Sequence, residues 1–401
     1  MNKKIAAAVS SAALVLGSSA ANAGIIIPAG EWTLDVNGNV NVYASHVTYD
    51  DTAAVGIVGA SQNGEDNTQS INTGLLPAWL GFTGTTRQND LDVSFTISMQ
   101  PNVSDNGVSG DSKVPLFRQA FITFGDKSWG TVKLGKDLGI FAGQAILNDM
   151  TLLGVGGGAA PRSGASTSLG GIGTGYIYPA WKGQISYTTP NFNGFTATVG
   201  ITNPNQNADA SVVATYQDRF GVEAQAQYAF DAGKVWVSGA SYDYRTGNDA
   251  AGVQWDATAI DIGAAVNMGN LGLVAYYYST DGVGNTMFGG YGGTVTPGSA
   301  NSGVDASGNE REGDGGYIQA TYVIPSGTKL GVAYGVSQLD KSNSSDTATV
   351  VEENKRWTIG AYHPLTKHLN LVAEYNNIEA SNYNSANAEM DSISLGAILF
   401  F

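Results

Sequence analysis

Runs in which apolar and polar residues strictly alternate recur along almost the entire chain. In residues 91–100, for example, every odd position is apolar and every even position is polar. A period of two is the period of a β-strand, whose successive side chains point to opposite faces of a sheet. Each run therefore predicts a strand with one apolar and one polar face, and similar runs lie in residues 32–44, 195–202 and 369–376.

The pattern predicts about sixteen strands. Their connections alternate between brief turns and longer polar loops, which is typical of an all-β, antiparallel transmembrane β-barrel. Segment 211–230 is unusually long and contains Asp218-Arg219, so it is either one bent strand or a hairpin. The predicted strands are 31–46, 75–87, 90–101, 116–126, 128–137, 180–189, 194–203, 211–230, 233–245, 254–268, 270–280, 315–324, 328–339, 354–363, 368–378 and 389–401.

The last predicted strand ends on an aromatic residue. Ile393, Leu395, Ala397, Leu399 and Phe401 share one face of it. A face that is apolar along its whole length suits contact with lipid. We expect this strand to pair with the first one, residues 32–44, because that pairing removes the last free edge of the sheet.

The beginning of the sequence resembles a signal peptide. Lys3 and Lys4 precede a small apolar stretch, and Ala21-Asn22-Ala23 has the small-x-small form that signal peptidase reads. We therefore expect residues 1–23 to be removed on export and residues 24–401 to form the barrel. We find no run of about twenty apolar residues, which excludes membrane-spanning helices. The chain has no cysteine, so it forms neither disulfides nor thiolate metal sites.

Composition and histidine placement exclude several functions. The net charge of −15 argues against nucleic acid as a partner, because phosphate contacts need a basic face. The three histidines are His46, His363 and His368. A hydrolase would need one of them beside a serine nucleophile, and their positions on the predicted strands do not converge on one. We expect no catalysis, no cofactor and no metal.

Aromatic residues lie mostly near the ends of predicted strands. Trp79, Trp129, Trp181, Trp357 and the run Tyr276-Tyr277-Tyr278 are the clearest cases. Amphipathic rings at such positions are typical of the headgroup zone of a membrane, and packing at a trimer contact or inside the lumen remains an alternative for some of them.

One irregular stretch, residues 138–179, is exceptionally long. It contains the glycine-rich runs 154–158 and 170–175. A loop of about forty residues is uncommon in a compact protein and is usually functional. No Gly-Lys-Ser or Gly-Lys-Thr follows the glycines, so they do not form a phosphate-binding loop. We expect the stretch to fold into the lumen and narrow it; a surface loop and a plug remain alternatives.

Several features of the sequence together resemble the general-diffusion porins of Gram-negative outer membranes. They are the segments 120–125 and 129–136, the signal sequence, the long third loop and terminal Phe401. The resemblance implies a sixteen-stranded barrel, a homotrimer, and passive flow of ions and small hydrophilic solutes. It places the protein in the cell outer membrane, among lipid and lipopolysaccharide. It further implies that the barrel-assembly machinery reads the last strand, with Leu395, Leu399 and Phe401 as the signal.

The family usually sets basic residues on the barrel wall opposite acidic residues of the third loop. Alternation places Arg87, Lys133 and Lys182 on polar faces, whereas the face of Arg118 is ambiguous. The charged residues of the loop and its entrance are Asp137, Asp149 and Arg162. These seven residues are our candidates for lining the pore and its constriction.

The balance of charge predicts at most mild selectivity. Other lumenal candidates, including Glu223 and Glu374, leave the two signs nearly equal. Most of the excess acidic residues lie in loops, which favours a mild preference for cations. Salt would screen these loop charges over roughly 10 Å. A substrate-specific channel and a plugged structural or adhesive barrel remain alternatives. One acidic loop cluster is either solvated charge or a calcium site: Asp305, Asn309, Glu310, Glu312 and Asp314.

Overall fold

The structure is a computed structural model of the chain. It describes residues 24–50, 54–58, 65–101, 103, 116–158, 167–203, 215–216, 219–246, 252–286 and 296–401. The expected signal peptide, residues 1–23, and Arg162 lie outside the described residues.

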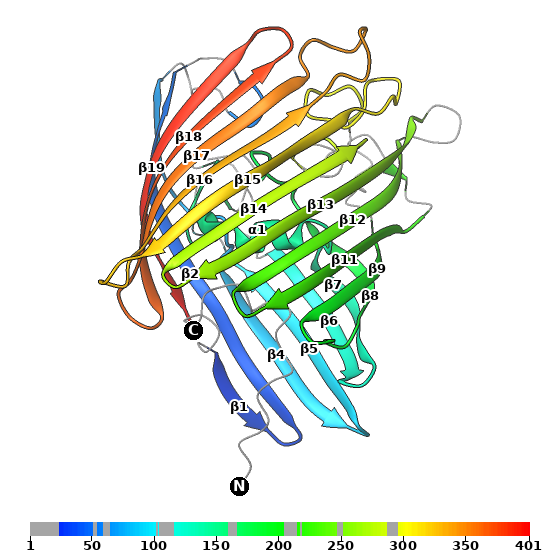
Figure 1. The fold of residues 1–401 in the computed structure, drawn as a ribbon, viewed down its shortest axis with the longest axis vertical. Coiled ribbons are helices and arrows are strands. Elements are labelled where there is room, and N and C mark those ends of the chain that lie inside the picture. The colour runs from blue at the N-terminus through cyan, green and yellow to red at the C-terminus, as the bar shows by residue number, and fades with distance from the viewer. Residues whose placement is uncertain are drawn as a thin grey trace.

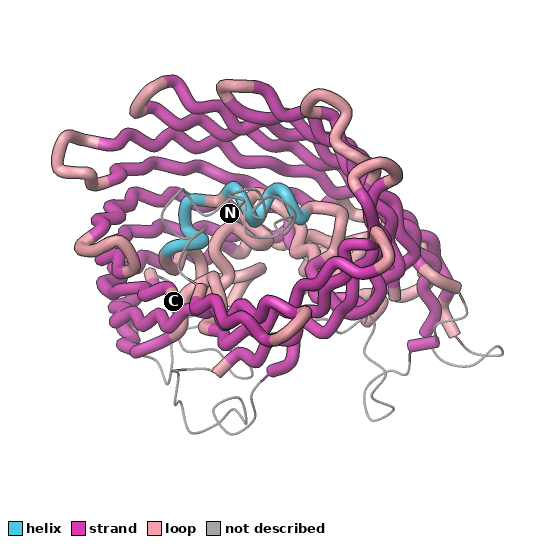
Figure 2. The backbone as a smooth tube through the Cα atoms, turned by 90° about the horizontal axis from the view of Figure 1, so that it is seen from below, coloured by secondary structure: helices cyan, strands magenta, loops and turns pink. Residues whose placement is uncertain are grey.

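Sixteen long antiparallel strands close into a barrel, which Figures 1 and 2 show from the side and along the lumen. Each strand pairs with the next along the chain, and the last pairs with the first. The predicted fold class is therefore confirmed. The long strands are β2 (Trp32–Tyr49), β4 (Trp79–Gln88), β5 (Leu91–Gln100), β6 (Leu116–Asp126), β7 (Gly130–Leu138), β8 (Trp181–Thr188), β9 (Phe195–Thr202), β11 (Gly221–Phe230), β12 (Gly233–Thr246), β13 (Gln254–Met268), β14 (Leu271–Asp281), β15 (Glu312–Val323), β16 (Lys329–Leu339), β17 (Val351–Pro364), β18 (Leu369–Asn382) and β19 (Asn387–Phe400).

Three short strands extend this barrel: β1 (Ile25–Ala29), β3 (Asn67–Asn72) and β10 (Thr215–Tyr216). The first two pair with the beginning and the end of β2. Alternation did not predict β1 or β3, because β1 is apolar throughout and β3 is almost entirely polar. A segment with only one kind of residue shows no alternation, so the sequence does not indicate a strand with one buried face.

The described parts of segment 211–230 form two pieces of one strand and not a hairpin. Both β10 and β11 pair antiparallel with β12, through Tyr216 opposite Arg245 and Val222 opposite Ser241. The two pieces therefore run in the same direction along the same neighbour. This arrangement preserves the count of sixteen long strands.

The two ends of the barrel differ. At one end, called here the short-turn end, neighbouring strands are joined by turns such as Asn89-Asp90 and Asp231-Ala232. At the other, the long-loop end, the connections include 282–311 and 340–350. The alternation of short and long connections holds except between β18 and β19, where only residues 383–386 intervene at the long-loop end.

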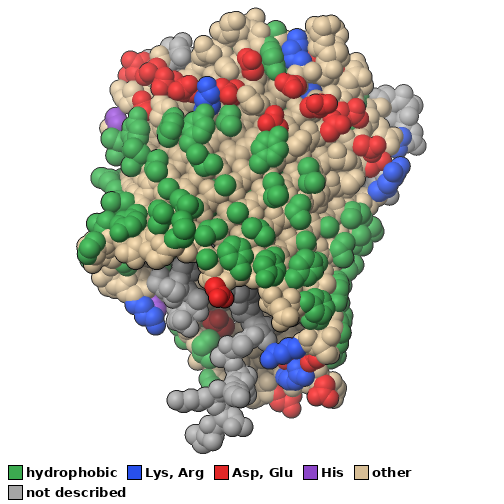
Figure 3. Space-filling view, viewed as in Figure 1, with side chains coloured by type: hydrophobic (Ala, Val, Ile, Leu, Met, Phe, Trp, Pro, Cys, Tyr) green, Lys and Arg blue, Asp and Glu red, His purple; other side chains and the backbone are tan. Residues whose placement is uncertain are grey.

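The outer and inner faces of the wall have opposite character. Outward side chains such as Leu395 and Ile359 are 57% and 60% exposed, whereas the inward Ser394 is fully buried. Figure 3 shows hydrophobic side chains spread over the middle of the visible face, with Asp and Glu gathered toward the long-loop end. Neither helix in the described residues has the length and hydropathy needed to cross a membrane.

The barrel closes through residues 38–49 of the chain and its last strand. Leu395 lies opposite Ala44, and Phe400 opposite Asn39. The N–H of Phe401 donates to the carbonyl of Gly38 at 3.0 Å, and the N–H of Gly38 donates back to the carbonyl of Phe401 at 2.8 Å. The terminal residue thus contributes two backbone hydrogen bonds to the seam.

We expect deletion of Phe401 to reduce the yield of folded barrel while leaving the conductance of each folded channel unchanged. Two backbone bonds worth about 1 kcal/mol each are lost at the point of closure. The measurement is the fraction of the outer-membrane protein that keeps the fast gel mobility of a folded barrel before heating. Ile393→Ala is the control, because it shortens an outward side chain of the same strand and keeps both bonds. A normal yield of the truncated chain would contradict an assembly role for this residue.

Candidate functional site in the barrel lumen

The described parts of the connection between β7 and β8 lie inside the barrel. These parts, residues 139–158 and 167–180, are called the inserted segment; they contain α1 (Gly143–Asn148) and η2 (Met150–Leu153). Figure 2 shows the helix within the ring of strands. The prediction that this stretch folds into the lumen is confirmed.

Three carboxylates of the wall hold the backbone of the inserted segment. Glu223 on β11 accepts from the N–H of Ile140 at 2.6 Å and of Phe141 at 3.0 Å. Asp261 on β13 accepts from the N–H of Ala142 at 3.2 Å. Irregular backbone leaves N–H groups without secondary-structure partners, and charged acceptors satisfy them strongly.

The third carboxylate, Glu374 on β18, explains the first glycine run. It accepts from the N–H of Val155 and of Gly156, both at 2.8 Å. A Cβ at Gly154 would lie 2.0 Å from the Oε1 atom of Glu374, and Gly156 has a φ of +59°. Side chains at these positions would therefore block or strain the approach of the backbone to the carboxylate.

Uncharged wall residues add further bonds to the same segment. The hydroxyl of Tyr43 donates to the carbonyl of Leu153 at 2.6 Å, and that of Tyr317 donates to the carbonyl of Ala145 at 2.8 Å. The side chain of Gln319 accepts from the N–H of Met150 at 2.7 Å. The segment is thus fixed on several strands at once.

Asp149 joins the two helical turns of the inserted segment to each other and to the wall. Its carboxylate accepts from the N–H of Thr151 and from the hydroxyl of Tyr176, both at 2.9 Å. The guanidinium of Arg356 on β17 lies 3.6 Å away, and both side chains are buried. Asp149 was a sequence candidate for the constriction, whereas Arg356 was not, although its alternation with Asn354 and Thr358 placed it on the polar face.

An aromatic cluster covers the wall of β12 to β15 and packs against α1. Its rings approach closely, with centroid distances of 5.3 Å for Tyr244 and Trp255 and 5.7 Å for Tyr276 and Tyr317. The cluster also contains Phe141 from the inserted segment. Burial of this much apolar surface favours the folded position of the segment.

Two of the three tyrosines in 276–278 pack inside the lumen, which the sequence left open as an alternative to the headgroup zone. Tyr276 and Tyr278 face inward and are buried, and only Tyr277 faces outward, 52% exposed. Consecutive residues of a strand point to opposite faces, so a run of three cannot lie on the outer surface.

Lys133 and Asp137 lie on the inner face of β7 and form an ion pair with each other. Gln119 also donates to the carboxylate of Asp137 at 3.0 Å. The side chain of Lys133 retains 21% exposure, whereas that of Asp137 is buried. The structure therefore places two of the sequence candidates together on the lumen wall.

Lys182 lies on the inner face of β8 but is buried. It forms an ion pair with Glu223 and donates to the hydroxyl of Tyr242 at 2.7 Å. Since Glu223 also holds the inserted segment, Lys182 compensates the charge of that anchoring carboxylate. Its position differs from that of a cation facing the water of the lumen.

Arg87 lies at the short-turn end, one residue before the end of β4. Its guanidinium forms ion pairs with Asp92 at 2.7 Å and Asp126 at 2.9 Å. These partners belong to the ends of neighbouring strands and not to the inserted segment.

Arg118 is half-buried on β6, within electrostatic range of Tyr178 in the inserted segment. Its face was ambiguous because the pairing of β5 and β6 shifts register between Ser98 and Met99. Such a bulge changes which residues of the strand face inward.

Water reaches the inner wall unevenly. On β15 to β19 the inward side chains are mostly buried; Ser337, Thr358 and Asn376 are fully buried. Toward the short-turn end of β4 to β9, the inward Thr83 and Thr198 are half-exposed. Nearer the long-loop end of the same strands, inward side chains such as Ser98, Gln100 and Gln184 are buried, so the half-exposed part of this wall is limited to its short-turn end.

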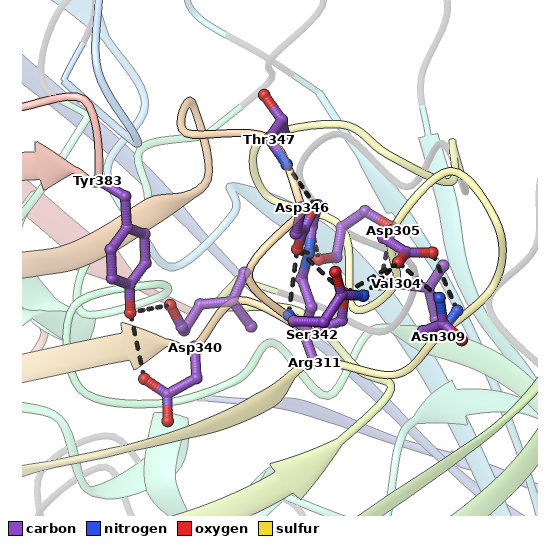
Figure 4. A network of polar contacts seen from close by, with 12 residues as sticks. Val304, Asp305, Asn309, Arg311, Asp340, Ser342, Asp346, Thr347 and Tyr383 are labelled. Carbon is purple, nitrogen blue, oxygen red and sulfur yellow. Dashed lines mark hydrogen bonds and ion pairs between the residues drawn. The ribbon is translucent and has the colours of Figure 1, made fainter.

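Two loops at the long-loop end are joined by a polar network, shown in Figure 4. The Nε and Nη2 atoms of Arg311 donate to Asp346 at 2.7 and 2.8 Å. Asp305 accepts from the side chains of Asn309 at 2.7 Å and of Ser342 at 2.9 Å. Burial raises the pKa of Asp305, but these bonds outweigh it and hold that pKa well below the ordinary range.

The proposed calcium cluster is divided in the structure. Asp305 and Asn309 form one turn, whereas Glu312 and Asp314 belong to β15. Within the described part of the chain, no three acidic or histidine side chains form a group suited to a metal ion.

Comparison with known proteins gives a family and a fold. The family model described as "Gram-negative porin" matches residues 8–383. No curated protein matches the sequence.

Three solved structures illustrate the likeness in fold. The outer membrane channel DcaP of Acinetobacter baumannii has 16% identity and a TM-score of 0.69, with 94% of this chain and 100% of that one covered. The anion-selective porin from Comamonas acidovorans has 16% identity and a TM-score of 0.63, with 92% and 100% covered. The trimer form of OmpT, an outer membrane protein of Vibrio cholerae, has 13% identity and a TM-score of 0.56, with 92% and 99% covered.

We expect Asp346→Asn to loosen the loop network at neutral pH, because removing one partner of a buried ion pair costs about 3–5 kcal/mol. Burial raises the pKa of Asp346, but the hydrogen bonds that it accepts, first those from Arg311, together lower that pKa by more than burial raises it. The pKa of Asp346 therefore lies below its ordinary value. The stabilisation is therefore present at neutral pH and is lost only as the pH falls below about 4.

The measurement is amide hydrogen exchange of residues 299–305 and 342–347 at pH 7 and at lower pH. The control is Asp340→Asn. Asp340 lies at the start of the connection 340–350, is exposed and accepts a hydrogen bond from the hydroxyl of Tyr383 at 3.2 Å. Equal exchange in the two variants would show that the Arg311–Asp346 pair does not hold the loops.

Proposed function

Because this chain belongs to the family of Gram-negative porins, we propose that its inserted segment narrows a water-filled passage and that the wall beside it sets a mild charge preference. The chain is an outer-membrane channel for passive diffusion. The solutes proposed for it are ions and small hydrophilic molecules.

The observation that carries the constriction is the one-sided attachment of the inserted segment. Glu223, Asp261 and Glu374 hold it toward β11, β13 and β18. Toward the short-turn end, the inner wall of β4 to β9 keeps half-exposed polar side chains. This asymmetry supports a narrowed passage over a plug, since a plug would bury the wall on all sides.

The sequence candidates take different parts in this proposal. Lys133, Asp137 and Arg118 line the passage, and Arg162 adds a charge from the loop. Asp149 and Lys182 position the inserted segment through Arg356 and Glu223. Arg87 lies at the opening on the short-turn end.

Assembly and surroundings follow the family. A homotrimer is supported by the trimer form of the similar OmpT structure. We propose that residues 1–23 are cleaved on export, that the barrel-assembly machinery reads Leu395, Leu399 and Phe401, and that lipid and lipopolysaccharide surround the barrel. Acidic residues at the long-loop end, visible in Figure 3, would concentrate cations at that opening.

Purified protein in planar bilayers should show conductance steps in multiples of three and a reversal potential of mild cation preference. Lys133→Gln should raise that preference about twofold, because Asp137 then lacks its countercharge, and Asp137→Asn should lower it by a similar factor. Arg87→Gln is the control and should change the ratio less. Absence of conductance would contradict the diffusion channel, and saturable block by one solute would favour a substrate-specific channel.

A second experiment tests the inserted segment as the narrowest point. Glu374→Ala leaves two buried N–H groups without acceptors, each costing about 1–3 kcal/mol, so the segment around Val155 should loosen. We expect larger and noisier single-channel conductance. Glu379→Ala is the matched control, since it lies on the same strand and faces outward. Equal conductance in the two variants would show that this segment does not limit the flow.

A further inference from the structure

We infer that the carboxylate of Asp35 binds the α-ammonium group that cleavage before Gly24 creates, so that processing of the chain completes the seam of the barrel. This inference rests on the cleavage proposed above. Its basis is the short-turn end of the seam, where β1, Asp35 and the end of β19 meet.

The strand β1 occupies the same edge of β2 as the last strand of the barrel. Ile25 lies opposite Val36, whereas Phe401 exchanges two backbone hydrogen bonds with Gly38. Figure 1 shows β1 beside the lower end of β2. A single residue of β2 therefore separates the part paired with β19 from the part paired with β1. Gly24 precedes Ile25, so it lies where β1 comes nearest to the end of β19.

The turn between β1 and β2 fixes β1 in this position. The carbonyl of Glu31 accepts from the hydroxyl of Thr86 at 2.8 Å, and its carboxylate accepts from the side-chain amide of Gln88 at 2.9 Å. Gly30, the other residue of the turn, has a φ of +68°. Because these bonds and the strand pairing hold the hairpin, the place of Gly24 follows from the fold.

Asp35 lies beside Gly24 on the inner face of β2. It is opposite Ile26 of β1 on one side and Thr83 of β4 on the other. Asn37 forms a side-chain hydrogen bond with the carboxylate, but the Oδ1 atom is buried and has no partner among the residues that the structure describes. A buried carboxylate oxygen without a donor is unfavourable, so this position is suited to a positively charged donor.

The backbone of Gly24 approaches this oxygen closely. A Cβ at Gly24 would lie 2.0 Å from the Oδ1 atom of Asp35 and 3.0 Å from the Oδ2 atom. Bond lengths of about 1.5 Å then place the nitrogen of Gly24 within about 5 Å of the Oδ1 atom. An opposite charge at about 4–6 Å stabilises an ionised group. Glycine suits this position, because any larger side chain would occupy the place of the carboxylate oxygen.

Cleavage changes the chemistry of that nitrogen. Hydrolysis breaks the C–N bond between Ala23 and Gly24, and the oxygen of water joins the carbonyl carbon to leave a carboxylate on the released peptide. The two hydrogens of water join the N–H of Gly24, which becomes an ammonium group with three donors. A neutral amide with one donor thereby becomes a cation beside the unpartnered oxygen of Asp35.

Two other carboxylates lie near this end of the seam. Glu31 is bound by Gln88 at the turn, which is the end of β1 remote from Gly24. The carboxylate of the last residue, Phe401, is the nearer competitor, but one of its oxygens already accepts from the N–H of Gly38 at 2.8 Å. Of these three acids, Asp35 combines a position beside Gly24 with an unoccupied buried oxygen.

The test measures how fast the α-amino group of Gly24 is acylated in the folded protein. Protein purified from the outer membrane is treated at pH 7 with an N-hydroxysuccinimide ester, and mass spectrometry of the N-terminal peptide gives the rate. An amine must lose its proton before it reacts, and a bound carboxylate opposes that loss. Asp35→Asn should therefore raise the rate about tenfold, which corresponds to about 1.4 kcal/mol in favour of the protonated amine. Glu31→Gln is the control and should leave the rate unchanged, because it removes a carboxylate from the turn of the same hairpin.

Gly24→Ala tests the same contact from the other partner. The added Cβ would take the place of the Oδ1 atom, so the ammonium group should move away and the rate should rise. The double variant Gly24→Ala/Asp35→Asn should react no faster than Asp35→Asn, because each change removes the same contact. Gly24→Ala keeps Asp35, so it tests the inference even where Asp35→Asn does not fold.

The outcomes separate this inference from the processing on which it rests. A first residue other than Gly24, read from the intact mass of the exported protein, overturns the proposed cleavage and this inference together. A chain that begins at Gly24 but reacts equally fast with and without Asp35 overturns this inference alone and assigns the ammonium group to the carboxylate of Phe401. A rate for Gly24→Ala equal to that of the unmodified protein also overturns it, since the close approach would then have no effect.

Discussion

The need of every backbone polar group for a partner governs this structure. A wall of strands in contact with lipid cannot leave an edge unpaired, because each free N–H or C=O group there costs several kcal/mol. Pairing between β19 and β2 meets this requirement, and the two hydrogen bonds between Phe401 and Gly38 complete it at the last residue. The alternating sequence follows from the same closure, since it separates a face toward lipid from a face toward the lumen.

The inserted segment meets the same requirement by other means. It has little regular structure, so its N–H groups need acceptors from outside, and the wall supplies Glu223, Asp261 and Glu374. Carboxylates within a barrel would otherwise be expected to face water and select ions. Here they hold the backbone, and the glycines at 154 and 156 allow it to come close enough. The hydrogen bonds to these carboxylates therefore explain the position of the inserted segment in the lumen without any appeal to ion selectivity.

The sequence predicted the parts of the molecule that depend on periodicity. The sixteen long strands and their closure were predictable because two different media impose a period of two on the chain. The boundaries were less predictable: β15 begins at Glu312, where alternation indicated 315, because backbone pairing continues after the apolar face has ended. The face of Arg118 depends on a bulge opposite Ser98 and Met99, and a register shift leaves no clear mark in one sequence.

Contacts between the inserted segment and the wall were beyond prediction because they join residues far apart in the chain. Nothing near Asp149 in sequence indicates Arg356, and nothing near Lys182 indicates that Glu223 binds a backbone as well as an ammonium group. These partners change the meaning of the predicted charges. Lys182 becomes part of a support, and Lys133 acts beside a carboxylate of its own strand.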